Sequence, residues 1–104
     1  MKIVLEGYMI QAHSIRLEYG RTSPGTIAIV ETPAPMIAWA ISGESQAAWR
    51  IRVGCRGEML WDSQWVRSAS QCAAYAGKAL TPGDVNELSL EVMDESGAVS
   101  AAAC

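Results

Sequence analysis

Few side chains in this sequence combine types and spacings that could carry out a reaction. His13 is the only histidine among the 104 residues, so a histidine-dependent nucleophile would have to use it, together with the adjacent Ser14. No nucleophile-elbow sequence surrounds this pair, and the chain has no glycine-rich phosphate loop and no metal-ligand spacing. We therefore expect His13 to be a surface residue, and we expect neither a cofactor nor a bound metal.

The eleven Asp and Glu residues are the other source of chemistry, because glycoside hydrolysis usually needs two carboxyl groups across the scissile bond. The alternation of the strands described below places most of them on solvated faces. Four fall at expected turns, where a carboxylate commonly accepts backbone N–H groups: Asp62, Asp84, Asp94 and Glu95. No catalytic pair is visible, so the sequence predicts a chain without catalytic residues.

The stretch LWDSQWV, residues 60–66, holds two of the four tryptophans and is the best candidate for ligand binding. An exposed indole beside polar groups can stack on the apolar face of a sugar ring, and such a platform would comprise Trp61, Trp65, Gln64 and Asp62. The alternative is packing, in which a turn or bulge capped by Asp62 brings Trp61 and Trp65 together as a cross-strand pair. Packing is favoured because the chain has no phenylalanine, so that tryptophan must supply much of the core's bulk.

Hydrophobic and polar residues alternate in several short runs, which is typical of half-buried strands. These runs cover residues 14–19, 25–31, 35–41, 48–55 and 86–93. Turn-forming residues separate them about every ten residues, which favours an all-β sandwich or small barrel. We interpret the alanine-rich segment 68–80 as strand and loop. The residues expected in the core are Trp39, Trp49, Ile51, Val53, Tyr75, Leu88, Leu90 and Val92.

The composition and charge of the chain limit the kinds of partner that we expect it to bind. Half of the residues are hydrophobic and 18% are charged, as in an ordinary globular domain with one core. The net charge is −3 and the eight Lys and Arg residues form no cluster, so we expect no nucleic-acid partner. We see no secretory signal, and no run approaches the roughly 20 apolar residues of a membrane span. The three cysteines, Cys55, Cys72 and Cys104, cannot all pair within one molecule, which favours reduced thiols and a cytoplasmic location. We expect Cys55 and Cys72 to pack as small hydrophobic residues.

Five motifs from Pro35 to Ser100 resemble, in order and spacing, the fibronectin type III-like domain near the N-terminus of bacterial α-L-rhamnosidases. In this sequence they read PMIAWAI, QAAWRIRV, LWDSQWVRS, YAGKALTPGD and LEVMDESGAVS. Two positions depart from the family pattern: the hairpin glycine is Gln64 here, and a Tyr-Tyr-Trp strand is Glu87-Leu88-Ser89. Residues 1–34 match poorly and are expected to add at least one strand.

The resemblance implies a fibronectin type III or immunoglobulin-like antiparallel β-sandwich of about seven strands, with residues 1–104 forming one domain. It further implies an accessory module of a much larger glycosidase in which a separate helical-barrel domain carries out catalysis. We therefore expect a non-catalytic scaffold whose partners are other domains of such an enzyme. Binding of a rhamnose-containing carbohydrate is the alternative.

Overall fold

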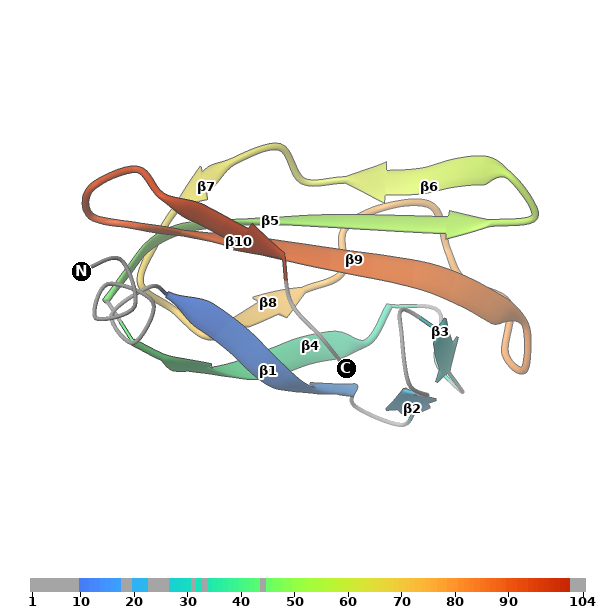
Figure 1. Ribbon diagram of the computed structural model, residues 1–104. Coiled ribbons are helices and arrows are strands. Elements are labelled where there is room, and N and C mark those ends of the chain that lie inside the picture. The colour runs from blue at the N-terminus through green and yellow to red at the C-terminus, as the bar shows by residue number, and fades with distance from the viewer. Residues whose placement is uncertain are drawn as a thin grey trace.

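The structure is a computed structural model that describes residues 10–17, 20–22, 27–30, 32, 34–43 and 45–101, and they form two antiparallel β-sheets packed face to face (Figure 1). The smaller sheet has the order β1–β4–β8, with the bounds Gln11–Leu17, Met36–Ser42 and Cys72–Ala74. The larger sheet has the order β2–β3–β9–β5–β6, while β10 also pairs with β9 and β7 also pairs with β5. Its strands are β2 Gly20–Thr22, β3 Ile27–Val30, β5 Gln46–Cys55, β6 Glu58–Asp62, β7 Val66–Arg67, β9 Val85–Asp94 and β10 Val99–Ala101.

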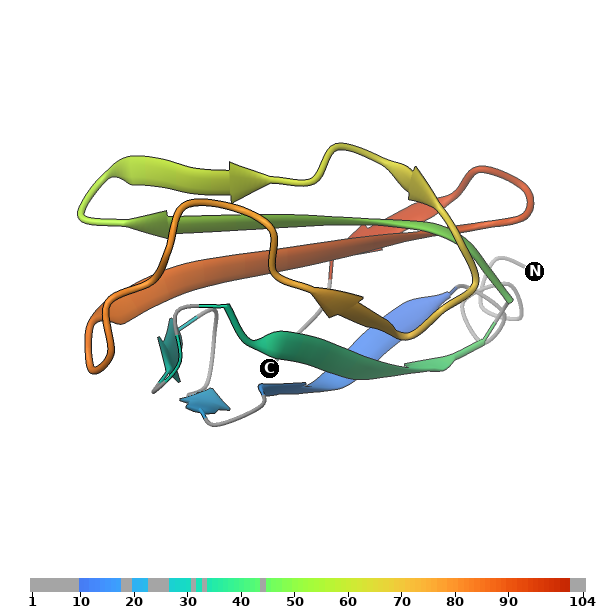
Figure 2. The same ribbon diagram turned by 180° about the vertical axis from the view of Figure 1, so that it is seen from behind.

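The predicted all-β sandwich is confirmed, with the two-sheet arrangement of an immunoglobulin-like domain. Several strands are short segments that share one neighbour: β6 and β7 both pair with β5, and β3 and β10 both pair with β9. Figure 2 shows the chain running from β6 through β7 and then crossing to β8 in the other sheet. The alanine-rich segment 68–80 forms β8 and irregular chain, as expected, and the residues described before position 35 include three strands, β1, β2 and β3.

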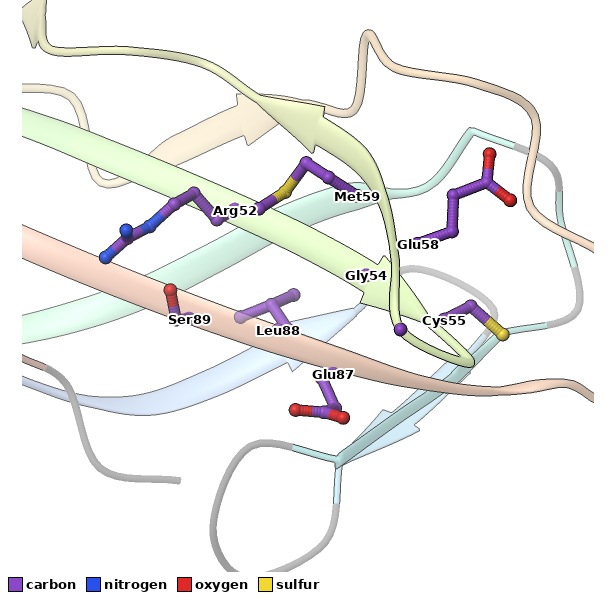
Figure 3. Close-up of a pocket in the computed structure, with 9 residues that line it drawn as sticks. Arg52, Gly54, Cys55, Glu58, Met59, Glu87, Leu88 and Ser89 are labelled. Carbon is purple, nitrogen blue, oxygen red and sulfur yellow. The ribbon is translucent and has the colours of Figure 1, made fainter.

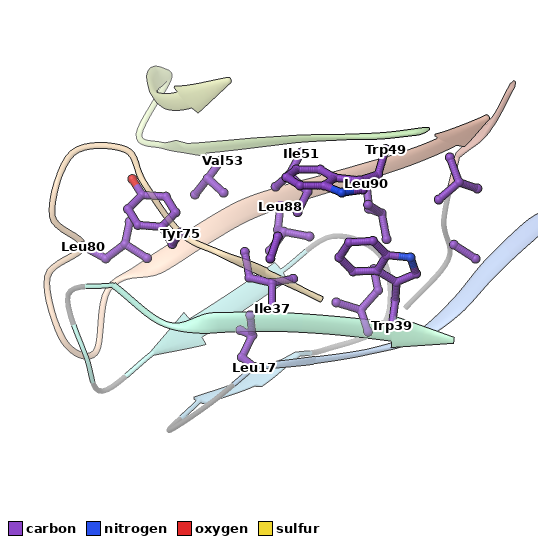
Figure 4. Packing of buried hydrophobic residues seen from close by; sticks show 14 of the residues in the cluster. Leu17, Ile37, Trp39, Trp49, Ile51, Val53, Tyr75, Leu80, Leu88 and Leu90 are labelled. Atoms are coloured by element: carbon purple, nitrogen blue, oxygen red, sulfur yellow. The ribbon is translucent and has the colours of Figure 1, made fainter. Parts of the chain in front are cut away.

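The long strands β5 and β9 form the centre of the larger sheet and pair from Gln46 opposite Asp94 to Gly54 opposite Glu87. Because successive side chains of a strand point to opposite faces, each of these strands gives every second residue to the core. Figure 4 shows these side chains between the larger sheet and β4. At most 8% of the surface is exposed in each of Trp39, Trp49, Ile51, Val53, Tyr75, Leu88, Leu90 and Val92.

Two tryptophans supply bulk to this core, where the sequence offers no phenylalanine. The rings of Trp39 and Trp49 meet edge to face with their centroids 5.9 Å apart. Trp39 Nε1 donates to Gln46 Oε1 at 2.9 Å, and Gln46 Nε2 donates to the backbone oxygens of Ser68 and Ser70 at 2.9 and 2.7 Å. A single buried amide therefore satisfies the indole and ties the segment before β8 to the core.

The loop after Tyr75 packs directly against β6 because Gly77 has no side chain. A Cβ atom at Gly77 would lie 2.4 Å from Trp61 Cβ and 2.5 Å from the Leu60 carbonyl oxygen. The Tyr75 hydroxyl donates to the Lys78 carbonyl oxygen at 2.5 Å, and the Lys78 N–H donates to the Leu60 carbonyl oxygen at 3.0 Å. Burial raises the pKa of the Tyr75 hydroxyl, the donor in this contact. The Tyr-x-Gly and Leu-Trp motifs are thus two halves of one packed contact.

Substitution of Gly77 by alanine tests this contact. The added methyl group has to displace backbone on β6, so we expect Gly77→Ala to lower the free energy of unfolding by about 2–4 kcal/mol. Urea denaturation followed by tryptophan fluorescence measures the change. The exposed neighbour Ala76 provides the control, since Ala76→Ser should change stability by less than about 0.5 kcal/mol. A Gly77→Ala variant as stable as the parent would show that the loop does not need this close approach.

Candidate functional site

Trp61, the first residue of the candidate sugar platform, packs into the molecule. It pairs with Val53, whose side chain is buried, and it packs against the core cluster. Its ring meets that of Tyr75 edge to face, with centroids 5.1 Å apart. The expected cross-strand pairing of Trp61 with Trp65 is wrong, because β6 and β7 both run antiparallel to β5 and the chain does not reverse between them.

The tight reversal of the edge strand lies instead between Cys55 and Glu58, which pair at the end of β5 and β6. The two residues between them, Arg56 and Gly57, have φ values of 51° and 80°. Two successive positive φ values are the geometry of a type I′ turn, whose twist matches that of the flanking strands. One close turn at this point leaves the whole stretch from Glu58 to Arg67 free to follow β5.

The segment Asp62-Ser63-Gln64 is a bulge that interrupts the edge strand and replaces its lost ladder bonds. The Ile51 N–H donates to Ser63 Oγ at 2.8 Å, and the Ser63 N–H donates to the Ile51 carbonyl oxygen at 2.9 Å. Asp62 Oδ1 accepts the N–H of Gln64 at 2.9 Å and so caps the bulge. Gln64 has a φ of 58°, a left-handed conformation that glycine adopts most easily. Gln64 stands where the resembled family pattern has glycine, and the backbone explains that preference.

Asp62 is also the centre of an ion-pair pattern on the outer face of the larger sheet. Arg50 Nε and Nη2 donate to its two carboxylate oxygens at 3.0 and 2.6 Å. This hydrogen-bonded guanidinium, with the Gln64 N–H as the second cause, lowers the pKa of Asp62 to about 2. Next to it, Arg52 donates to Glu91 at 2.9 Å. The carboxylate of Asp62 is therefore engaged in structural contacts on both oxygens.

Trp65 lies on this outer face, on the opposite side of the strand from Trp61. The next residue, Val66, pairs with Trp49 and packs against the core, so the alternation of side chains turns Trp65 outward. Trp65 is half-buried there, and Gln64 is exposed. The structure thus brings Asp62 and Trp65 to one face and leaves Trp61 on the other, so the two indoles do not form one platform.

Sequence reasoning missed the exposed apolar side chains of this outer face. Of the described residues, four large hydrophobic ones are exposed, and three of them stand on the outer face: Met59 at 54%, Val85 at 55% and Val99 at 43%. Met59 pairs with Gly54 and Val99 pairs with Met93, while Val85 precedes the buried Asn86. Their positions in the alternating pattern could have indicated this exposure, because an apolar residue at an outward position of a strand does not face the core.

A hollow of about 330 Å³ opens on the same face at the position of Gly54 (Figure 3). In the ladder, Gly54 is paired with Met59 on one side and with Glu87 on the other. Because Gly54 has no side chain, its strand forms the floor between these two neighbours. Arg52 and Ser89, which pair with each other, border the hollow along the strands.

The remaining candidate residues have structural surroundings. His13 is exposed, with Nδ1 3.0 Å from Ser14 Oγ. Asp84 pairs with Arg56 at 3.1 Å. Asp94 Oδ1 accepts bonds from the Ser96 hydroxyl, the Ser96 N–H and the Ala98 N–H, and the hydroxyl bond is the main cause that lowers the pKa of Asp94. Glu95 is exposed in the same turn. No three His, Cys, Asp or Glu residues gather as metal ligands within the part of the chain that is described.

The cysteines differ from one another in their surroundings. Cys55 is half-buried, with Sγ 3.4 Å from the Val85 carbonyl oxygen, and Cys72 is exposed; both are free thiols. The expected packing of Cys72 as a small hydrophobe is wrong, because Cys72 occupies an outward position of β8 while its neighbour Ala73 is buried. Cys104 lies outside the described residues. Over the described ranges, no helix has the length and apolarity that a membrane crossing takes.

Replacing Gln64 by glycine relieves the left-handed backbone at the bulge. We expect Gln64→Gly to raise the free energy of unfolding by about 0.5–1 kcal/mol, since the penalty of the left-handed conformation outweighs the added freedom of the unfolded chain. Gln71 is exposed and has no positive φ, so the identical change Gln71→Gly should lower stability instead. Urea denaturation of both variants measures the difference, and two changes of the same sign would contradict this role of the bulge.

The Arg50–Asp62 pair predicts an acid-dependent loss of stability. Because the pKa of Asp62 is lowered from 3.8 to about 2 in the folded chain, its contribution is present above about pH 4 and is lost as the pH falls toward about 2. Arg50→Met should reduce this loss, measured as the shift of the urea midpoint between about pH 5 and about pH 2. Arg67→Met removes an exposed charge from the same sheet and should leave the loss unchanged. An equal shift in both variants would exclude this pair as the cause.

The comparisons with known proteins agree with this fold. An α-L-rhamnosidase structure from Dictyoglumus thermophilum is similar with a TM-score of 0.69 and 20% identity, over 93% of this chain and 12% of that chain. This degree of identity supports the fold alone. The comparison with curated proteins finds no match. Residues 12–103 match the family model described as the Rha78A-like, N-terminal immunoglobulin domain, and the chain therefore belongs to that family.

Proposed function

We propose that this chain is a non-catalytic module of an α-L-rhamnosidase-like protein, and that it docks onto neighbouring domains through the outer face of its larger sheet. The observation that carries the proposal is the exposure of Met59, Val85 and Val99 on that one face. Met59 and Val85 stand near one end of this face and Val99 near the other, so that a partner lying along the sheet could cover all three. The matched rhamnosidase structure supports it, because 12% of that chain corresponds to this domain and the remainder offers partners.

The charged residues of this face favour docking as a fixed surface. Arg50 and Arg52 each pair with an acid on an adjacent strand, Asp62 on β6 and Glu91 on β9, so these four side chains are held in place between the apolar residues at the two ends of the sheet. A surface that is ordered before binding loses less conformational entropy on association. The domain would hold its neighbours in a fixed orientation without any turnover of its own.

The arrangement of carboxylates supports the absence of a catalytic role. Within the described residues, the acids with neither an ion pair nor a hydrogen bond are Glu87, near the start of β9, and Glu95, just after its end, while Asp94 accepts hydrogen bonds within its own turn. At about 3.3 Å per residue, their backbones are about 26 Å apart. Glycosidases place their two carboxyl groups about 5–10 Å apart across the bond that is cleaved. This distance is too long for hydrolysis with either retention or inversion of the sugar configuration.

The docking proposal is tested on the solved rhamnosidase from Dictyoglumus thermophilum. The measurement is the solvent-accessible area of the positions aligned with Met59, Val85 and Val99, with and without the rest of that chain. We expect these positions to lose most of their area to neighbouring domains, whereas the position aligned with Met36, exposed on the smaller sheet, keeps its area. An outer face that is open to solvent in the complete enzyme would reject this proposal.

Carbohydrate binding is the second candidate, and the observation that favours it is the half-buried indole of Trp65 on the outer face, which also carries Arg50 and Asp62. Methyl α-L-rhamnopyranoside would then change the tryptophan fluorescence in a saturable way, and Trp65→Ala would abolish the change. Trp61→Phe keeps the packed ring contact and serves as the control. No saturable change at millimolar sugar would reject this candidate and leave docking in place.

A further inference from the structure

We propose that the hollow over Gly54 receives a lysine or arginine side chain from the docked partner. The alkyl stem of that side chain lies against Met59 and its cationic head pairs with Glu87. This inference rests on the proposed docking role of the outer face and adds the chemistry of one contact. It concerns a pocket far along the sheet from Trp65, which plays no part in it.

The shape of the hollow follows from the ladder. Met59, Gly54 and Glu87 stand in one row across β6, β5 and β9. Neighbouring strands are about 4.8 Å apart, so the two outer residues are separated by about 10 Å with only glycine between them. That gap has the width of one side chain, and the hollow measures about 330 Å³. Figure 3 shows Met59 and Glu87 on the two sides of Gly54.

Glycine at position 54 also has a local structural cause, which makes the slot a fixed feature. A Cβ atom there would lie 3.1 Å from the carbonyl oxygen of Glu58, the first residue of β6. The strand register shifts beside this residue, between Val53 and Gly54. The chain therefore keeps a side-chain-free position on the outer face of β5, with a methionine and a carboxylate next to it.

The charges around the hollow favour a cation. The arginines described on β5 and in the turn after it each have an acidic partner: Arg50 with Asp62, Arg52 with Glu91 and Arg56 with Asp84. Glu87, in contrast, has no ion pair or hydrogen bond with the residues that the structure describes, and neither does the hydroxyl of Ser89. An occupant that supplies N–H donors satisfies both groups, whereas an anion would meet the unpaired carboxylate.

Met59 forms an apolar wall of the hollow, which favours a basic side chain with an alkyl stem over a simple cation. Met59 is 54% exposed and is the flexible, polarisable residue that adapts to varied partners. Lysine and arginine bury their methylene stems against such surfaces while the charged head stays at the rim. A stem of three or four carbons spans the slot from Met59 to Glu87, and the head then reaches the carboxylate.

The test titrates the ¹⁵N-labelled chain with n-butylguanidinium, an analogue of the arginine side chain, at constant ionic strength. We expect a saturable change in the amide resonances of Gly54, Met59 and Glu87, with a dissociation constant on the order of 10 mM for so small a ligand. Guanidinium without the alkyl stem should bind several-fold more weakly, and pentanoate should leave these amides unchanged. Saturation by pentanoate, or no saturation by n-butylguanidinium at a tenfold excess over that constant, would overturn the inference.

Three variants locate the binding. Glu87→Gln should weaken n-butylguanidinium about three- to fivefold, which is the range of an exposed ion pair. Met59→Ser should weaken it by a similar factor through the loss of the apolar wall. Glu95→Gln removes an exposed acid at the far end of β9 and should leave the affinity unchanged. Equal affinity of Glu87→Gln and the parent chain would refute the assigned contact.

Failure of this inference is distinguishable from failure of the docking proposal. If n-butylguanidinium does not bind but the aligned face is buried in the solved rhamnosidase, only the proposed contact with a basic side chain is rejected. An outer face open to solvent in that enzyme would reject docking, whatever the probe does.

Discussion

The pairing of β5 with β9 is the interaction on which the rest of the structure depends. Each strand has ten residues, and the alternation of their side chains gives the larger sheet two chemically different faces. The inner face packs Ile51 and Leu90 against the smaller sheet. The outer face carries paired arginines, exposed apolar residues and the Gly54 hollow. The core therefore lies on one side of these two strands, and the exposed apolar residues and the hollow lie on the other.

Much of the fold could be predicted from the sequence, because alternation is a local property. The run around Trp49 to Val53 indicates both the strand and its buried face. The sequence predicts a turn or bulge capped by Asp62 at Asp62-Ser63-Gln64, and the structure has the bulge and the cap. Its effect on the alternation could not be predicted, since it depends on contacts with Arg50 and Ile51 on another strand. Trp61 and Trp65 are four positions apart, which would put both on one face of a straight strand, but the bulge places them on opposite faces.

The motifs that resemble the rhamnosidase domains acquire physical meanings from the structure. Gly77 allows the chain to touch Trp61, so a tyrosine motif and a tryptophan motif form one contact. Asp94 accepts three bonds within its own turn. These features build the sandwich rather than a reaction site. The outer face escaped sequence reasoning because a single outward methionine or valine is ordinary on a protein surface, and only the register places Met59, Val85 and Val99 on one face.

The most direct test of the account is the rate of methionine oxidation by peroxide, measured by mass spectrometry for the isolated domain and for an α-L-rhamnosidase-like polypeptide that carries it. Met59 stands on the outer face of the larger sheet and Met36 on the smaller sheet, and both are exposed in the domain alone. The account predicts that the larger protein protects Met59 and leaves Met36 reactive. Equal oxidation of Met59 in both proteins would contradict it.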